Sequence, residues 1–213
     1  MHANFPLFPL PLVAQPHCRL PLQIFEPRYL DLVKNCAARQ QCFGVVTLDQ
    51  SGAGRPGTLQ SSIATAQRQP PIFPIGTAVK IVDFNQLPNG LLGIVCEGQY
   101  RFRVHDAAVN PQKLLEATIE TLPQQNEFPL PTEFDELVGV VMALLAHDYA
   151  RNMGYEFVAE ETFWRDKPVR LSWYLSALLP VSDEFKYRWL ATDDAHARLA
   201  SIMETVDRMQ HVD

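Results

Sequence analysis

The sequence predicts an α+β protein in two parts: a β-rich barrel or sandwich with one helix over residues 1–122, then a four-helix bundle over residues 123–213. In the first part, apolar runs of strand length recur between turn residues. From Pro129 onward the apolar period changes from two to about 3.6, which is typical of helices packed on one face. The predicted linker between the two parts is residues 122–131.

Seven strands are predicted in the first part, each an apolar run bounded by turn-forming residues. They cover residues 5–13, 19–24, 42–48, 58–66, 77–87, 91–104 and 115–122. The clearest hairpin spans residues 83–92, where Pro88-Asn89-Gly90 separates two apolar strands. Because Asn-Gly tolerates positive φ angles at both positions, we expect a type I′ turn there.

One helix interrupts these strands and starts at Pro27 or Arg28, since a proline in the first turn loses no helical hydrogen bond. Its apolar residues recur at helical spacing, so we expect it to pack across the barrel. This expected stripe consists of Leu30, Leu32, Val33, Cys36 and Ala37.

The second part contains four predicted helices. A long helix over residues 134–145 follows Thr132 and Asp135, which resemble a capping arrangement. A second covers residues 169–179 and ends before Pro180, a third opens with Ser182-Asp183-Glu184, and a fourth starts at Asp193. The apolar stripe of the fourth is Leu199, Ile202, Met203, Val206 and Met209. We expect the three tryptophans to lie in the core or at a domain interface: Trp164, Trp173 and Trp189.

Composition and charge restrict the class of partner. Hydrophobic residues make up 47% of the chain and charged residues 20%, as in chains that fold around a core. The net charge of −6 divides into +2 for residues 1–122 and −8 for the remainder. Because nucleic-acid binding depends on a basic surface, the acidic second part makes polyanions poor candidates for the main partner.

We expect a cytoplasmic location without a membrane span. The four cysteines contain no C-x-x-C pair, which favours reduced, buried thiols over disulfides. Prolines interrupt the apolar amino terminus, and no stretch approaches the roughly 18–20 apolar residues of a membrane helix.

Six segments, taken in order, resemble a known family. They are Phe5-Pro-Leu-Phe-Pro-Leu, Leu20-Pro-Leu-Gln-Ile-Phe-Glu-Pro-Arg-Tyr29, Phe43-Gly-Val-Val, Gly76-Thr-Ala, Phe84-Asn-Gln-Leu-Pro-Asn-Gly-Leu and Gly98-Gln-Tyr-Arg-Phe-Arg-Val. The ordered set resembles the amino-terminal, substrate-binding domain of Lon proteases, closely over residues 5–122 and loosely beyond.

This resemblance implies a PUA-like pseudobarrel followed by a helical bundle, and a role in binding unfolded or tagged polypeptides, with a separate protease as a further candidate partner. The expected peptide-binding residues are Phe25, Glu26, Arg28, Tyr29, Phe84 and Leu87. No G-x-x-x-x-G-K-[ST] motif occurs, so we expect no ATP hydrolysis, no peptidase activity and no cofactor. Residues 24–29 also have a structural interpretation, in which Ile24 and Phe25 pack and Glu26 or Arg28 forms a hydrogen-bonded ion pair that sets the angle of the helix.

Other motifs are interpreted as structural. The loop Gly52-Ala-Gly-Arg-Pro-Gly57 fits G-x-G-x-x-G, but a predicted strand follows it where a dinucleotide site needs a helix. His17-Cys18, Cys36 with Cys42, and His147 beside Asp148 lack the spacing of a zinc or thiol site. The carboxylate pairs Glu160-Glu161 and Asp193-Asp194 are expected to cap helices or face solvent.

Two alternative functions stay open. By analogy with other PUA-like barrels, a patch could bind RNA, and its candidate residues are Arg19, Lys80, Arg101 and Arg103. A hydrolase would require a Cys or Ser within hydrogen-bond reach of a His in a pocket.

Overall fold

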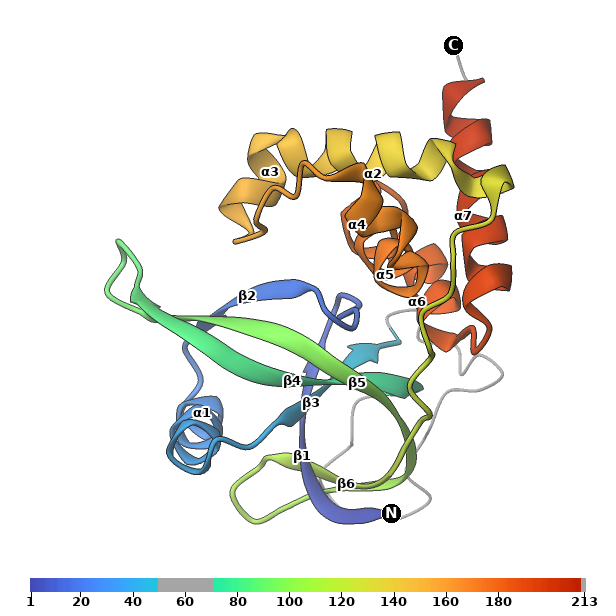
Figure 1. The fold of residues 1–213 in the computed structure, drawn as a ribbon. Helices are drawn as coiled ribbons and strands as arrows, with labels where there is room; N and C mark the ends of the chain where they lie inside the picture. Colours follow the sequence, from blue (N-terminus) through green and yellow to red (C-terminus); the bar gives the residue numbers. More distant parts are fainter. Residues whose placement is uncertain (50–70, 212–213) are drawn as a thin grey trace. The chain divides into compact units, whose positions relative to one another are not determined.

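The structure, a computed structural model, describes residues 1–49 and 71–211, and its contacts divide the chain into the units Met1–Pro123 and Gln124–Asp213 (Figure 1). The predicted strand 58–66 and the Gly-rich loop 52–57 lie outside the described residues. In the described ranges, one six-stranded sheet and seven α-helices confirm the α+β class.

The first unit contains the sheet and one helix. Its elements are β1 (His2–Leu10), β2 (Arg19–Ile24), α1 (Pro27–Arg39), β3 (Phe43–Leu48), β4 (Ile72–Gln86), β5 (Leu92–Val109) and β6 (Leu115–Thr121). Five strands pair in a closed cycle, β5–β4–β3–β1–β6–β5, in which only β1 and β3 are parallel. The strand β2 pairs with the first half of β5, on the edge that β6 occupies further along.

The helix α1 begins at Pro27 as expected, and its buried face contacts the apolar cluster that β1, β2, β3, β4 and β5 enclose. This face consists of Tyr29, Leu32, Val33 and Cys36. Leu30, which we expected in the stripe, is exposed, so this part of the prediction is wrong. The face is centred on Tyr29 because its ring stacks on Phe8, with the ring centroids 3.8 Å apart.

The hairpin between β4 and β5 is present, but its turn is not type I′. That type requires a positive φ at both central residues. Here Gly90 has a φ of 80°, whereas Asn89 is absent from the non-glycine residues with positive φ in the described ranges. The Gly90 N–H donates to the Leu87 carbonyl, and the Leu87 N–H donates to the Leu91 carbonyl, which closes a three-residue loop.

The second unit is helical. After a 3₁₀ turn at Thr132–Phe134, its helices are α2 (Glu136–Ala146), α3 (Asp148–Asn152), α4 (Glu161–Arg165), α5 (Pro168–Leu178), α6 (Asp183–Ala191) and α7 (Ala195–Gln210). Four of them, α2, α5, α6 and α7, correspond to the predicted helices, whereas the five-residue helices α3 and α4 were not predicted. They are too short for an apolar period to show.

Side chains cap the amino termini of α3 and α7, whereas the cap predicted for α2 is not formed. The Asp194 carboxylate accepts hydrogen bonds from the N–H groups of His196 and Ala197 and so caps α7. Asp135 makes no cap for α2, and its carboxylate pairs with Arg165 instead. The expected Thr132–Asp135 capping arrangement is therefore wrong.

The core of the second unit contains a buried arginine. Arg198 is fully buried, and its guanidinium lies 3.5 Å from the ring centroid of Trp173. It donates hydrogen bonds to Ser172 Oγ, the Thr192 carbonyl and Gln125 Oε1, at 2.8, 2.9 and 2.5 Å. All three tryptophans are buried, as expected of core residues.

Candidate functional site

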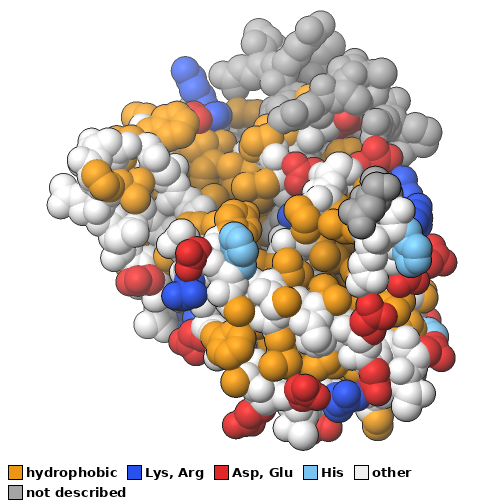
Figure 2. Space-filling view, turned by 90° about the horizontal axis from the view of Figure 1, so that it is seen from above, with side chains coloured by type: hydrophobic (Ala, Val, Ile, Leu, Met, Phe, Trp, Pro, Cys, Tyr) orange, Lys and Arg blue, Asp and Glu red, His pale blue; other side chains and the backbone are white. Residues whose placement is uncertain are grey.

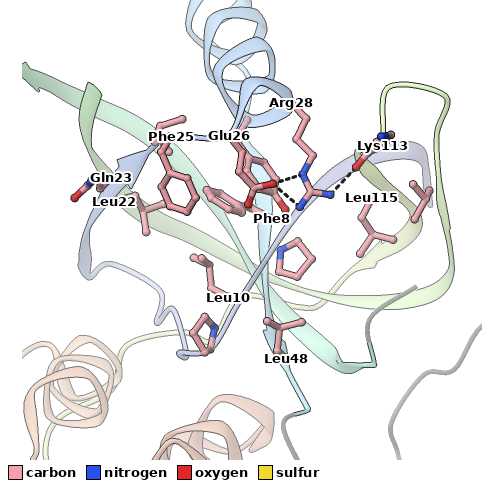
Figure 3. Close-up of a pocket in the computed structure, with 15 residues that line it drawn as sticks. Phe8, Leu10, Leu22, Gln23, Phe25, Glu26, Arg28, Leu48, Lys113 and Leu115 are labelled. Atoms are coloured by element: carbon pink, nitrogen blue, oxygen red, sulfur yellow. Dashed lines mark hydrogen bonds and ion pairs between the residues drawn. The ribbon is translucent and has the colours of Figure 1, made fainter. Parts of the chain in front are cut away.

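A pocket of about 410 Å³ opens in the first unit (Figure 3). Its walls come from the end of β1, the end of β2, the start of α1, one residue of β3 and the hairpin between β5 and β6. Most of the lining side chains are apolar, including Phe8, Leu10, Leu22, Ile24, Phe25, Leu48, Val109 and Leu115. Its volume lies in the range of ~300–1,000 Å³ that is usual for ligand sites.

Arg28 crosses one wall of the pocket and joins two elements (Figure 3). Its Nε and Nη2 lie 2.8 and 2.7 Å from Glu26 Oε2, which confirms the predicted ion pair. Its Nη1 donates to the Lys113 carbonyl in the β5–β6 hairpin at 2.9 Å. The guanidinium also lies 4.7 Å from the ring centroid of Tyr29. The side chain thereby fixes the hairpin turn relative to the amino terminus of α1.

The turn that Arg28 contacts has a strained backbone. Lys113 has a φ of 62°, in the left-handed region that favours glycine. The turn is closed by the Lys113 N–H donating to the Asn110 carbonyl, while Asn110 Oδ1 accepts from the Leu114 N–H. Strain of this kind persists where the surroundings hold it in place, and it is frequent at binding sites.

Tyr29 forms part of the wall and of the core at once. The residue is only 7% exposed, yet it belongs to the pocket lining. Burial raises the pKa of its phenol, while Arg28 lowers it and Glu26 raises it. The phenol is therefore neutral at physiological pH, and the paired Glu26 and Arg28 are the charged side chains beside it.

The structure brings together four of the six residues that the sequence predicted for the site. Phe25, Glu26, Arg28 and Tyr29 line the pocket, whereas Phe84 and Leu87 of the β4–β5 hairpin do not. Phe25 was expected to pack inward, but it is 67% exposed. Sequence reasoning missed the contributions of β1 and of the β5–β6 hairpin. A signal for the β1 contribution was the Pro-Leu-Pro run at residues 9–11, because prolines also occur in the segment 20–29 that lines the pocket.

The sequence matches the ATP-dependent protease La (LON) substrate-binding domain family over residues 4–208. The chain belongs to this family. Among solved structures it is similar to the Lon N-terminal domain protein from Xanthomonas campestris, with 26% identity, a TM-score of 0.69, and coverage of 95% of this chain and 98% of that one. It is also similar in fold to the N-terminal domain of the Mycobacterium avium complex Lon protease, with 15% identity, a TM-score of 0.60, and coverage of 94% and 96%. A search of curated proteins gave no match.

Three of the four basic residues weighed for RNA binding are either buried or separated by an acidic residue in this LON-family chain. Lys80 and Arg19 both lie in register with Glu97, which stands between them in the sheet. Arg101 is buried. On the face shown in Figure 2, acidic side chains are spread among apolar and uncharged ones, and basic side chains are few. We see no observation here that favours a polyanion.

The cysteines are placed as structural thiols. Burial raises the pKa of Cys36 to about 11 and that of Cys96 to about 12, and it also raises the pKa of Cys42. A nucleophilic cysteine needs the opposite shift. In the described part of the chain, no three His, Cys, Asp or Glu side chains cluster as metal ligands would.

The remaining polar motifs act at helix ends. His147 Nδ1 accepts the Tyr149 N–H and caps α3, and Glu161 pairs with Arg165 one turn along α4. Of the helices in the described ranges, none has the length and apolar character that crossing a bilayer requires.

Proposed function

We propose that this chain binds polypeptide segments through the pocket beside Phe25 and Arg28, and that it performs no chemistry on them. The observation that carries the proposal is an apolar pocket with an exposed phenylalanine at its lining, in a chain of a substrate-binding family. Its clients would be unfolded or tagged polypeptides, which a separate protease would then degrade. The closed cycle of strand pairings supports the PUA-like class for the first unit.

The lining chemistry supports binding rather than catalysis. Among the described residues, those that line the pocket include no Ser, Cys or His, the side chains that most often act as nucleophile or base. Glu26 and Arg28 neutralise each other. A pocket of this composition can exclude water from an apolar side chain and hold it weakly, which is what a module that samples many clients requires.

Phe25 gives the sharpest test because it is exposed in the free protein. Burying a phenylalanine side chain against a partner contributes ~1.5–3 kcal/mol. The substitution Phe25→Ser should therefore weaken binding about 10- to 100-fold. Because Phe25 is exposed, the same change should alter the free energy of unfolding by no more than ~0.5 kcal/mol.

The assay is fluorescence anisotropy with a dye-labelled, permanently unfolded polypeptide that has been reduced and carboxymethylated. Phe84→Ser is the matched control, since Phe84 is 50% exposed and lies outside the pocket lining. We expect Phe84→Ser to bind like the wild type. Equal losses for the two variants would mean that the pocket is not the binding surface, and no binding by the wild type would refute the proposed function.

A further inference from the structure

Among the strands of residues 1–49 and 71–211, the pocket lies where the ring lacks one strand pairing. Within these ranges β6 pairs with β1 through residues 2–7, so the next residues of β1, including Pro9, are paired with β3 on one edge only. In the same ranges β2 is paired with β5 on one edge only. The pocket lining takes its residues from these two strand ends, so two half-paired strands border it. A partner could therefore add a strand here, or it could insert side chains alone.

Prolines remove the donors that strand addition needs. Just before β2, the Cys18 carbonyl accepts the Gly98 N–H, so every second residue from Cys18 onward points its backbone N–H and C=O groups at β5. Pro21 alternates with these residues, so its backbone nitrogen lies on the free edge, where a proline in an edge strand is tolerated. In β1, Pro9 lies in register with β3. Because a proline nitrogen carries no hydrogen, a proline within a paired strand has its nitrogen on the unpaired edge, and that edge lacks a donor there. Pro11, the next lining residue in step with Pro9, has no N–H either.

Gln23 is therefore the one residue of β2 beside the pocket whose N–H faces the free edge, since it alternates with the residues that face β5. Edges that carry prolines are a common defence against strand pairing. Both borders of this pocket have that defence.

The charges and the size of the pocket define what fits. Glu26 and Arg28 form a neutral pair, Arg28 also donates to a carbonyl, and Lys113 adds one positive charge to the lining. An apolar cavity of roughly 150 Å³ is enough for a benzene ring. At about 410 Å³, this pocket has room for more than one such group.

We infer that the pocket takes neighbouring large apolar side chains from an extended polypeptide, by side-chain insertion and without strand addition. This inference rests on the proposed function. It specifies the recognition chemistry: affinity depends on the apolar side chains and not on the partner's backbone N–H groups.

Three dye-labelled peptides of about a dozen residues test it, measured by anisotropy against the full chain. The parent carries one Leu-Phe pair at the centre of a Gly, Ser and Gln sequence, with a blocked amino terminus and an amidated carboxyl terminus. The second has N-methyl groups on the two residues that flank the pair. The third replaces the pair by Ser-Ser.

We expect N-methylation to change the affinity less than about threefold, and Ser-Ser to weaken it more than about tenfold. A tenfold loss on N-methylation, or equal binding of the Ser-Ser peptide, would overturn side-chain insertion while leaving polypeptide binding intact. If the parent does not bind, the proposed function fails and this inference fails with it.

Discussion

The substitution Arg28→Ala should open one wall of the pocket and lower the stability of the first unit. It removes the pair with Glu26, which is more than one-third exposed on both sides and is worth only ~0.2–1 kcal/mol after solvent screening. It removes the hydrogen bond to the Lys113 carbonyl, worth about 1 kcal/mol, and the stack on Tyr29, worth ~0.5–1 kcal/mol. We therefore expect the free energy of unfolding to fall by about 2 kcal/mol.

Arg28→Ala should also weaken peptide binding more than removal of an arginine elsewhere on the surface does. In this variant the β5–β6 hairpin turn is no longer fixed to α1. Arg28→Lys keeps the charge but lacks the planar fork, so it should recover less than half of either effect. Denaturant unfolding is followed by far-UV circular dichroism, and peptide binding by anisotropy. Tryptophan fluorescence is a second probe that reports the second unit alone, since all three tryptophans lie there.

Arg188→Ala is the matched control, because Arg188 forms an exposed ion pair with Glu184 one helical turn away. We expect a change of no more than ~0.5 kcal/mol and no change in binding. If Arg28→Ala behaved like this control in both assays, Arg28 would not hold the wall of the pocket.

Three further predictions concern strain, burial and pH. Lys113→Gly should stabilise the chain by ~0.5–1 kcal/mol because it relieves a positive φ, whereas Lys113→Ala should not; equal melting temperatures for the two variants would contradict this. Arg198→Met should cost ~3–5 kcal/mol and change tryptophan emission, since the buried Ser172 Oγ and two half-buried acceptors lose the guanidinium; a cost under ~1 kcal/mol would count against that account. Because burial raises the pKa of Cys36 and Cys96 above the ordinary 9.0, the neutral thiols stabilise the fold below pH 9, and this stability should be lost as pH rises toward 11–12. Under reducing conditions the slope should be up to ~1.4 kcal/mol per pH unit for each thiol, and Cys96→Ala should reduce it; parallel slopes would show that Cys96 is not responsible.

Local patterns in the sequence predicted the elements whose ends are set locally. The strand 19–24 and the start of α1 at Pro27 agree with the structure, because a half-buried strand and an N-terminal proline both leave a direct pattern in the sequence. The turn type at Gly90 was not predictable from Asn-Gly alone. The turn runs from Leu87 to Gly90, so Pro88 is its first central residue, and the negative φ of a proline excludes type I′. The buried face of α1 was misjudged because Tyr29 was not counted as apolar.

The site was only half predictable because its walls meet through tertiary contacts. Arg28 and Lys113 are 85 positions apart, and their bond joins an arginine to a backbone carbonyl, which no side-chain pattern records. Phe84 belongs to a resembling segment, yet it lies in a hairpin that does not reach the pocket. A sequence resemblance marks a whole segment, whereas the tertiary structure determines which side chains of that segment line the pocket.

The segment from Phe25 to Tyr29 shows why the structural and functional interpretations of a motif need not compete. Tyr29 turns into the core and stacks on Phe8, so it builds the fold. Arg28 directs its guanidinium to Glu26 and to the Lys113 carbonyl, so it shapes the wall of the pocket. Phe25 is left exposed and is the residue free to meet a client. Substitutions along this segment should therefore separate the two roles: changes at Tyr29 act mainly on stability, changes at Phe25 act mainly on affinity, and changes at Arg28 act on both.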